Sequence, residues 1–336
     1  MSGTEPFYPD GWFPVATSRE LGRKPLRRFL CGVPLVLFRD SAKAAVALHD
    51  RCPHRHAPLS DGRVVDGEIE CPYHGWRFNS EGRCTAIPFH DGAVPQRFVA
   101  RLPVEERHGL VFVKRGDGDA SIYTPYWEGD GRTLSKIIPT EAETRLIDVM
   151  ENVLDPTHTA FTHNTLMRGM GEKRPKVAVS VTANGDKLEL AFDGETAQDC
   201  LVSKLTGERN RTGSLTNILH PGIVEAVYWQ DHRLNLVTTV YFSPAHESLT
   251  RGFIVLTTPM KAGLAYLKAA VFIPMFRMII RQDRTVLKAS HANWKTFDRP
   301  QPAVSPHDYM RPNLEALLRR QRPPVADEPL SFELRL

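Results

Sequence analysis

The sequence predicts an α+β protein of two domains, an all-β domain over residues 7–116 and a larger domain over 117–336 in which a β-sheet packs with helices. Three observations lead to this prediction. Short apolar runs separated by turn dipeptides fill the first third of the chain. Alternating apolar and polar runs, which are typical of half-buried strands, recur in the remainder. A long apolar stretch with helical character begins near residue 264.

The expected strands of the first domain are short and lie between turn signals. They are the apolar runs at 33–38, 44–48, 67–71, 101–104 and 109–113. An acidic residue followed by glycine, a pair typical of tight turns, stands at 61–62, 66–67, 81–82 and 91–92. The segment 116–119, which alternates glycine and aspartate, is the expected domain boundary.

The second domain mixes the two kinds of element. A helix is expected over 143–154, where Leu146, Ile147, Met150 and Leu154 recur at helical spacing. Alternation predicts strands over 177–192, 215–218 and 237–242, and a further strand is expected over 252–258. Residues 262–289 are expected to form a helix in which Pro274 produces a kink or a break.

Composition and charge narrow the function classes. The net charge of +4 is spread over 43 basic and 39 acidic residues, and no basic run interleaved with aromatic residues indicates nucleic-acid binding. The longest apolar stretch, 264–280, contains Lys268 and Arg277 and is too short to span a bilayer. Residues 1–6 lack the features of a secretory signal. The odd number of cysteines, five, therefore favours metal binding in a reducing cytoplasm over a disulfide framework.

Two short motifs in the first domain combine cysteine with histidine. Cys52 stands two positions before His54, and Cys71 stands three positions before His74. Two such pairs on adjacent loops can meet at one metal centre, and in a Rieske [2Fe–2S] cluster two cysteines hold one iron while two histidines hold the other. A structural zinc site is one alternative, although its ligands more often pair as Cys-Cys and His-His. A mere packing role for buried cysteines is another, and it is the role expected for Cys31 and Cys84.

A second group of candidate ligands lies early in the second domain, where the chain carries Asn152, Asp155, His158 and His163. Two histidines and one carboxylate on one face of an iron leave positions open for dioxygen and a substrate. The two histidines are five positions apart, about 140° around a regular helix. A helix between them must therefore end or widen, or their rotamers must converge. Alternatively, Asp155 before Pro156 is an ordinary helix N-cap, and the histidines are ordinary partly buried side chains.

Both groups resemble the motifs of the Rieske non-heme iron oxygenase family, the ring-hydroxylating oxygenases. The resemblance extends over nearly the whole chain and is carried by the segments 52–60, 71–78, 82–88 and 151–163. His56 is a departure, because the family often has glycine at this position. The resemblance implies an N-terminal Rieske [2Fe–2S] domain followed by a C-terminal helix-grip catalytic domain with one mononuclear Fe(II).

The resemblance also implies a role for each candidate residue. The cluster ligands would be Cys52, His54, Cys71 and His74. The iron ligands would be His158, His163 and Asp283, the last from the segment 281–287. In a head-to-tail homotrimer, Asp155 would connect a cluster histidine of one subunit, His74 by preference, to an iron histidine of its neighbour. Asn152 would lie behind the iron ligands.

The implied activity is that of the oxygenase component of a monooxygenase, in the branch that contains the vanillate and dicamba demethylases. Such a component uses O2 and electrons from a ferredoxin or flavin reductase to hydroxylate or demethylate a small organic substrate, here expected to be aromatic or cyclic. No G-x-G-x-x-G segment follows a strand, so NAD(P)H is expected to act only through the reductase. Alternatives are a dihydroxylating dioxygenase or desaturase of the same family, a Rieske electron-transfer protein, and a zinc-binding protein without enzymatic activity.

Overall fold

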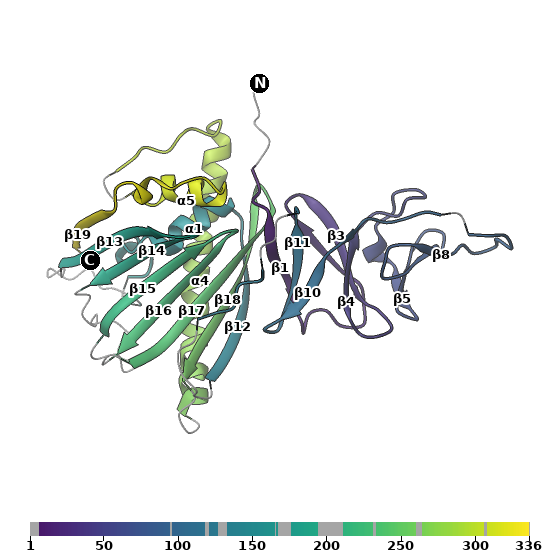
Figure 1. Cartoon of the computed structure of the whole chain (residues 1–336), viewed down its shortest axis with the longest axis horizontal. Helices are drawn as coiled ribbons and strands as arrows, with labels where there is room; N and C mark the ends of the chain where they lie inside the picture. Colours follow the sequence, from purple (N-terminus) through teal and green to yellow (C-terminus); the bar gives the residue numbers. More distant parts are fainter. Residues whose placement is uncertain are drawn as a thin grey trace. The chain divides into compact units, whose positions relative to one another are not determined.

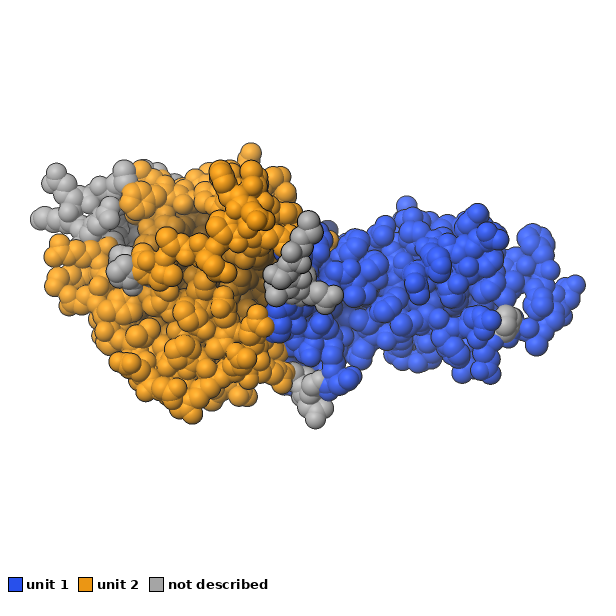
Figure 2. Space-filling view, turned by 90° about the horizontal axis from the view of Figure 1, so that it is seen from above, with its two compact units in different colours: residues 1–122, 243–247 blue, residues 123–242, 248–336 orange. Residues whose placement is uncertain are grey.

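The computed structural model of the chain describes residues 7–94, 96–117, 121–126, 133–164, 166, 176–193, 211–230, 233–259, 264–305 and 308–335. Two units are distinguished in it (Figure 2). The first comprises residues 1–122 and 243–247, and the second comprises residues 123–242 and 248–336. The predicted boundary at 116–119 lies partly outside the described residues and stays a prediction.

The first unit is built from three small sheets (Figure 1). One has the order β1 (Gly11–Thr17), β11 (Leu110–Arg115) and β10 (Val104–Arg107). The second has the order β2 (Leu26–Leu30), β3 (Val33–Arg39), β4 (Ala45–His49) and β9 (Arg101–Leu102). The third has the order β5 (Arg63–Val65), β6 (Glu68–Glu70), β7 (Arg77–Phe78) and β8 (Cys84–Ala86). The all-β character and four of the five predicted strands are confirmed. The strand predicted over 101–104 is divided at Pro103 between β9 and β10, which belong to different sheets.

The turn between β5 and β6 shows why the acidic-glycine pairs were informative. Asp66 and Gly67 have φ angles of 53° and 81°, in the left-handed region. A Cβ atom added at Gly67 would lie 2.1 Å from the backbone nitrogen of Ser41, so glycine is required on steric grounds as well. The short 3-10 helix η1 (Leu59–Asp61) precedes this hairpin.

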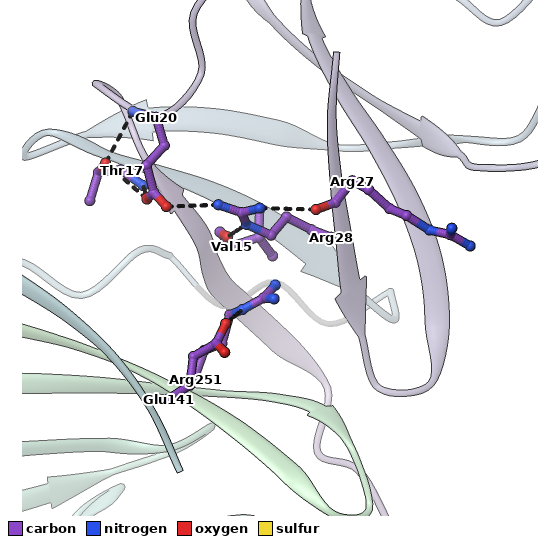
Figure 3. Close-up of polar contacts among 7 residues, drawn as sticks. All are labelled: Val15, Thr17, Glu20, Arg27, Arg28, Glu141 and Arg251. Carbon is purple, nitrogen blue, oxygen red and sulfur yellow. Dashed lines mark hydrogen bonds and ion pairs between the residues drawn. The ribbon is translucent and has the colours of Figure 1, made fainter. Parts of the chain in front are cut away.

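Charged side chains tie neighbouring strands together within each unit (Figure 3). In the first unit, Nε of Arg28 donates to the carbonyl oxygen of Val15 at 2.9 Å, and its Nη2 donates to Glu20 at 2.7 Å. In the second unit, Arg251 and Glu141 are opposite one another on paired strands and form an ion pair of 2.7 Å. Such cross-strand pairs favour one register of the strands.

The second unit is organised around one eight-stranded sheet (Figure 1). Its order is β12 (Thr133–Ala142), β18 (Leu249–Pro259), β17 (Arg233–His246), β16 (Ile223–Gln230), β15 (Arg211–Leu219), β14 (Lys187–Asp193), β13 (Lys176–Asn184) and β19 (Leu330–Arg335). The helices are α1 (Leu146–Leu154), α2 (Thr159–Thr162), α4 (Leu264–Thr296) and α5 (Arg311–Leu318), with the 3-10 helix η2 (Pro324–Ala326). The α+β class is therefore confirmed.

A hydrophobic core joins the sheet to these helices. It contains Val179 and Leu190 from the sheet, Met150 from α1, Leu287 from α4 and Leu314 from α5. Helix α4 continues through Pro274, so of the two predicted effects of this proline the break does not occur and the kink stays a prediction. Packing explains this, because residues on both sides of the proline contact the core and offset the loss of one backbone hydrogen bond. Within the described part of the chain, no helix combines the length and the apolar character needed to cross a membrane.

One segment from late in the chain belongs to the first unit. The backbone N–H groups of Cys31 and Gly32 donate to the carbonyl oxygens of Pro244 and Ala245, both at 2.7 Å. The hydroxyl of Ser243 donates to the carbonyl oxygen of Pro14 at 2.6 Å, and this hydrogen bond is buried. The end of β17 therefore completes the first unit by backbone pairing.

Candidate functional site

The two cysteine–histidine motifs form loops with the same backbone hydrogen bonds. In the first loop, the N–H of Cys52 donates to the carbonyl oxygen of Ala57, and the N–H of His56 donates back to that of Cys52. In the second, the N–H of Cys71 donates to Trp76, and the N–H of Gly75 donates back to Cys71. His56 and Gly75 occupy equivalent positions and both are left-handed, with φ of 60° and 70°. The family's glycine preference at position 56 thus has a conformational basis.

The two cysteines among the four candidate ligands are buried, and the two histidines are exposed. Cys52 and Cys71 are buried in a hydrophobic core, with 1% and 3% of their surface exposed. Burial, together with the neighbouring thiol of Cys71, raises the pKa of the Cys52 thiol to about 11. His54 and His74 are exposed, with ring centroids 4.5 Å apart. The cysteines thus point inward and the histidines lie at the surface of the unit.

Neighbouring side chains hold the two loops in place. The indole of Trp76 stacks on the ring of His54, with centroids 4.7 Å apart and planes 8° from parallel. Asp50, buried and just ahead of the first loop, accepts hydrogen bonds from the N–H and the hydroxyl of Ser60 at 2.7 and 2.6 Å. Ser60 lies just past the loop, so this carboxylate closes the loop at its base.

The donor set fits an iron–sulfur cluster with mixed ligands. The described cysteines are free thiols, so neither candidate is committed to a disulfide. A buried thiol with a raised pKa becomes a thiolate only if a nearby cation compensates its charge, as a cluster iron does. Cys31 and Cys84 lie in hydrophobic cores, as expected for packing residues, whereas Cys200 lies outside the described residues.

Three side chains of the second unit converge in a second candidate metal centre. Oδ1 of Asp283 lies 3.0 Å from Nε2 of His163 and 3.4 Å from Nε2 of His158. Ligand atoms of the three residues all lie within 4.8 Å of one another. The side chain of His163 is 1% exposed, and those of His158 and Asp283 are 19% and 20% exposed. The structure therefore brings Asp283 to two histidines that lie far earlier in the sequence.

The local backbone explains how His158 and His163, five positions apart, can face the same centre. Helix α2 has four residues and lies between the two histidines, with His158 at its N-cap and His163 at its C-cap. The ring centroids are 5.3 Å apart, at an interplanar angle of 75°. As the spacing required, the helix ends between the histidines, and the break lets both rings face Asp283. That residue is on α4, which contacts α2.

Asp155 lies at the end of α1, where its two oxygens have different partners. Oδ1 accepts hydrogen bonds from the N–H and the hydroxyl of Thr157 at 2.7 and 2.6 Å. Oδ2 lies 3.6 Å from Nδ1 of His158. Asp155 is the C-cap residue of α1 and His158 is the N-cap residue of α2, so the N-cap interpretation of Asp155 is wrong. Its carboxylate instead closes a local turn with Thr157 and contacts a candidate ligand. For Asn152, the described part of the chain supplies no side-chain contact with the centre, and its role stays a prediction.

The charges of this centre are strongly coupled. Burial acts to lower the pKa of His158, but Asp155 and Asp283 outweigh it and raise the pKa to about 9. Burial acts to raise the pKa of Asp283, but His158 and His163 hold it below its usual value. The pKa of Asp155 is also lowered, because His158 and Thr157 outweigh its burial. The site thus favours a positive charge between its carboxylates.

The donor atoms of this centre also suit a divalent cation. Oδ1 of Asp283 and Nδ1 of His158 are buried without a well-formed hydrogen bond among the described residues. Buried polar atoms normally form hydrogen bonds, so two buried atoms without one indicate that the centre binds a ligand. Two imidazole nitrogens and one carboxylate are the donor set of non-heme Fe(II) sites.

Sequence reasoning missed two residues that support the centre. Gln282 places Oε1 2.8 Å from Nδ1 of His163, and Thr157 binds Asp155 as described. Both are immediate neighbours or near neighbours of predicted ligands, and that adjacency was the only available signal. Arg311 of α5 was also missed; it contacts Asp148 at 2.8 Å and Glu151, and so links α5 to α1.

Small side chains lie on the sheet next to the core residues of the second unit, on the same face. Thr216, Ala226 and Thr238 are direct neighbours on β15, β16 and β17. Two positions along each strand, on the same face, lie core residues Ile218, Val224 and Val240. Because side chains alternate along a strand, the two threonines and the alanine also face the helices.

Comparison with known proteins identifies both halves of the chain. Residues 11–103 match the model of the Rieske [2Fe-2S] domain, and residues 142–308 match that of the vanillate O-demethylase oxygenase C-terminal domain. The Comamonas testosteroni putative toluene-4-sulfonate monooxygenase system iron-sulfur subunit TsaM2 is 41% identical over 162 residues, which are 46% of this chain and 46% of that protein. The dicamba O-demethylase oxygenase component of Stenotrophomonas maltophilia is 43% identical over 112 residues, 33% of each chain.

The fold has counterparts among solved structures. The structure of Pseudomonas putida CBB5 NdmA with caffeine superimposes with a TM-score of 0.72 and 22% identity, covering 96% of both chains. The sequence matches to the two curated relatives span less than half of either relative. Two successive family models and a shared fold across the chain agree with one another. The chain belongs to the Rieske oxygenase family, with a Rieske [2Fe–2S] domain ahead of a C-terminal domain of the vanillate O-demethylase oxygenase type.

Proposed function

We propose that this protein is the oxygenase component of a Rieske-type monooxygenase, which uses O2 to hydroxylate or demethylate a small organic substrate. The observation that carries the proposal is the convergence of His158, His163 and Asp283 behind a Rieske domain in one chain. Relatives that match part of this chain are named as a putative monooxygenase iron-sulfur subunit and an O-demethylase oxygenase component. Bound at these sites, a [2Fe–2S] cluster would supply single electrons and an Fe(II) would supply dioxygen activation.

The residues of the first unit would hold and expose the cluster. The buried thiols of Cys52 and Cys71 would bind the inner iron, and the exposed rings of His54 and His74 would bind the outer one. An exposed histidine edge gives electrons a short route to an external group. Trp76 stacks on His54 and restricts the orientation of that ring.

The residues of the second unit would hold the iron by Nε2 of both histidines and by Asp283. Three protein ligands leave the remaining positions to O2 and substrate. The side chains of Thr216, Ala226 and Thr238 would line the substrate's side of the sheet. This surface is small and mostly uncharged, which suits an aromatic or cyclic compound.

We further infer that electrons pass between subunits of a homotrimer at Asp155. Its carboxylate already contacts one candidate iron ligand, and 36% of its side chain is exposed, so an imidazole of a neighbouring subunit could reach it. Val153 and Phe161, which flank it in sequence, are 46% and 67% exposed, as is common for apolar residues at a subunit interface. A ferredoxin or flavin reductase in the cytoplasm would supply the electrons, with NAD(P)H acting only through that partner.

The test combines metal analysis with isotope labelling. Protein purified without air should contain two irons and two acid-labile sulfides for the cluster, and one further iron. Supplied with a surrogate reductase and a panel of aromatic methyl ethers and cyclic amines, it should couple O2 uptake to product formation. One atom from ¹⁸O2 should enter the hydroxylated product, or formaldehyde should appear. The variant His163→Ala is the control for uncoupled oxygen consumption.

Other outcomes would point to the alternatives. Two labelled oxygen atoms in one product would indicate a dihydroxylating dioxygenase, and a new double bond without labelled oxygen would indicate a desaturase. Stoichiometric zinc without sulfide would contradict the proposal entirely. An intact cluster in a protein that never binds a third iron would favour an electron-transfer role.

A further inference from the structure

We propose that Gln282 is the positioning residue of His163: it accepts a hydrogen bond from Nδ1 and so keeps Nε2 free to bind iron. The proposal rests on the iron site of the proposed function. It starts from one contact, the 2.8 Å distance between Oε1 of Gln282 and Nδ1 of His163. This is the hydrogen bond on the side of the ring that faces away from Asp283.

The proton of His163 decides whether the residue can bind a metal. A neutral imidazole carries its hydrogen on one nitrogen and offers a lone pair on the other. Nε2 of His163 lies 3.0 Å from Oδ1 of Asp283, so Nε2 is the nitrogen that faces the centre. A hydrogen on Nε2 would donate to Asp283 and occupy the position of the metal. A hydrogen on Nδ1, held by Gln282, leaves the lone pair of Nε2 available.

The burial of His163 makes this partner necessary. Its side chain is 1% exposed, so bulk water has no route to Nδ1. His158 differs, because its Nδ1 lies 3.6 Å from Asp155, beyond a normal hydrogen bond, and its side chain is 19% exposed. Of the two candidate iron histidines, His163 therefore has its far nitrogen fixed by a direct contact, whereas His158 is held more loosely by a charged neighbour.

The position of Gln282 in the chain couples its action to Asp283. The two residues are consecutive on α4, about 100° apart around the helix axis. One reaches Nε2 of His163 and the other reaches Nδ1, so they contact opposite sides of the same ring. A single turn of α4 thus supplies both a ligand and the group that orients another ligand.

A glutamine amide has an accepting oxygen and a donating NH2 group, and substitutions can distinguish the two. If the amide were reversed, its NH2 group would donate to Nδ1 and force the hydrogen onto Nε2, which opposes metal binding. Glutamate in its ionised form can only accept. Gln282→Glu therefore retains the proposed hydrogen bond, and Gln282→Leu removes it with little change in size. Gln282→Met is a second apolar variant in case the leucine variant folds poorly.

The experiment measures Fe(II) binding rather than turnover. Protein depleted of mononuclear iron, with its cluster intact, is titrated with Fe(II) without air, and thermal unfolding of the iron-depleted protein is recorded in parallel. Gln282→Leu should weaken Fe(II) binding by roughly 10–100-fold, the usual effect of removing such a partner. Gln282→Glu should stay within about threefold of the wild type, on the same ground. The exposed neighbour Arg284 supplies the control Arg284→Leu, which should bind as the wild type does.

Each result has a distinct meaning. Equal Fe(II) affinity in the wild type and Gln282→Leu would overturn this proposal while leaving the iron site in place. Equally weak binding by the glutamate and leucine variants would overturn it too, because an acceptor beside Nδ1 would then not be what sustains Fe(II) binding. A fall in the unfolding temperature of the iron-depleted leucine variant, with unchanged affinity, would make Gln282 a packing residue. A wild-type protein that binds no Fe(II) would overturn the proposed function, and this proposal with it.

Discussion

Oδ2 of Asp155 lies 3.6 Å from Nδ1 of His158, on the side of that ring opposite the contact with Asp283. The other oxygen of Asp155 is fixed by the N–H and the hydroxyl of Thr157. The carboxylate is therefore oriented locally while one oxygen remains directed at a candidate iron ligand. A carboxylate that bridges two imidazoles must not rotate, and the hydrogen bonds from Thr157 supply that restraint.

The first prediction separates a bridging role of Asp155 from a purely local role in the turn with Thr157. Asp155→Asn should retain the hydrogen bonds from Thr157 through its amide oxygen, and with them the fold and both metals. It loses the charge and the second acceptor, so product formation should fall at least about tenfold, the lower range for such supporting residues. The measurement is single-turnover product formation by the reduced protein. Thr157→Val, which removes only the hydroxyl contact, is the matched control and should lose little. Normal rates in Asp155→Asn would assign the bridge to another residue.

The second prediction concerns the three converging side chains. His158→Ala, His163→Ala and Asp283→Ala should each lower the mononuclear iron content and abolish turnover, because two donors alone hold Fe(II) weakly. The visible spectrum of the cluster should not change, since its candidate ligands belong to the other unit. Iron and sulfide analysis with absorption spectroscopy measures both. Glu143→Ala, which removes an exposed carboxylate paired with Lys288, is the control. Full iron content in Asp283→Ala would show that a different carboxylate completes the site.

The third prediction compares the equivalent positions of the two cysteine–histidine loops. Left-handed backbone is costly for residues with a Cβ atom, by about 1–2 kcal/mol, and this is partly offset by the greater freedom of glycine when unfolded. His56→Gly should therefore raise the free energy of unfolding by up to about 1 kcal/mol. Gly75→Ala should lower it by about 1–3 kcal/mol, because the φ angle is 70° and the new Cβ would lie 2.8 Å from Cγ of Pro88.

Denaturant unfolding of the iron–sulfur protein, followed by circular dichroism and by loss of cluster absorbance, measures both variants. Opposite signs of the two changes are the expected result. A destabilising His56→Gly would mean that the imidazole itself, and not the backbone, determines the residue at this position.

The fourth prediction concerns pH and the ion pairs that hold α1. Asp148 accepts from Nε of Arg145 at 2.6 Å and from Arg311 at 2.8 Å. Burial acts to raise the pKa of Asp148, but these two guanidinium groups outweigh it and lower the pKa. A lowered pKa in the folded state stabilises the protein above the unfolded value, near 3.9, and this contribution is lost as the pH falls through the folded value.

Asp148→Asn should accordingly cost about 1–3 kcal/mol of unfolding free energy at pH 7, the range for hydrogen bonds to charged groups. The difference between wild type and variant should shrink below about pH 4. Urea titrations of both proteins at pH 7 and at several values between 3 and 5 measure this. An equal difference at pH 3 and pH 7 would contradict the assignment of the lowered pKa to the carboxylate of Asp148.

The sequence was most informative at residue types that occur in few structural or chemical roles. Cysteine and histidine at two- and three-residue spacings predicted the first candidate site, and the structure places all four residues on two matching loops. Turn pairs such as Asp66 and Gly67 predicted the strand ends, because few residues tolerate that backbone. The assignment of His158, His163 and Asp283 as ligands required the family resemblance, since the spacing of the two histidines left ordinary side chains possible and nothing local distinguishes Asp283 from a solvated helix residue.

Elements that depend on distant partners were not predictable in this way. Strand β12 was missed because Lys136, Pro139 and Glu141 interrupt its apolar alternation, and its stability comes from pairing with β18. Strand β19 was missed because its partner, β13, lies about half the chain away. The contact of Gln282 with His163 spans 119 positions, so only the folded chain reveals it.

The pairing of Cys31 and Gly32 with Pro244 and Ala245 has a consequence for protein engineering and for evolution. A fragment that stops at Ile122 would leave the backbone N–H groups of Cys31 and Gly32 without their acceptors. The first unit therefore cannot be transferred to another protein as one continuous stretch of sequence. Swapping that unit between relatives therefore demands that residues 243–247 be exchanged with it. Hybrids made at a single crossover would misfold at this seam, whereas hybrids made at two crossovers would preserve it.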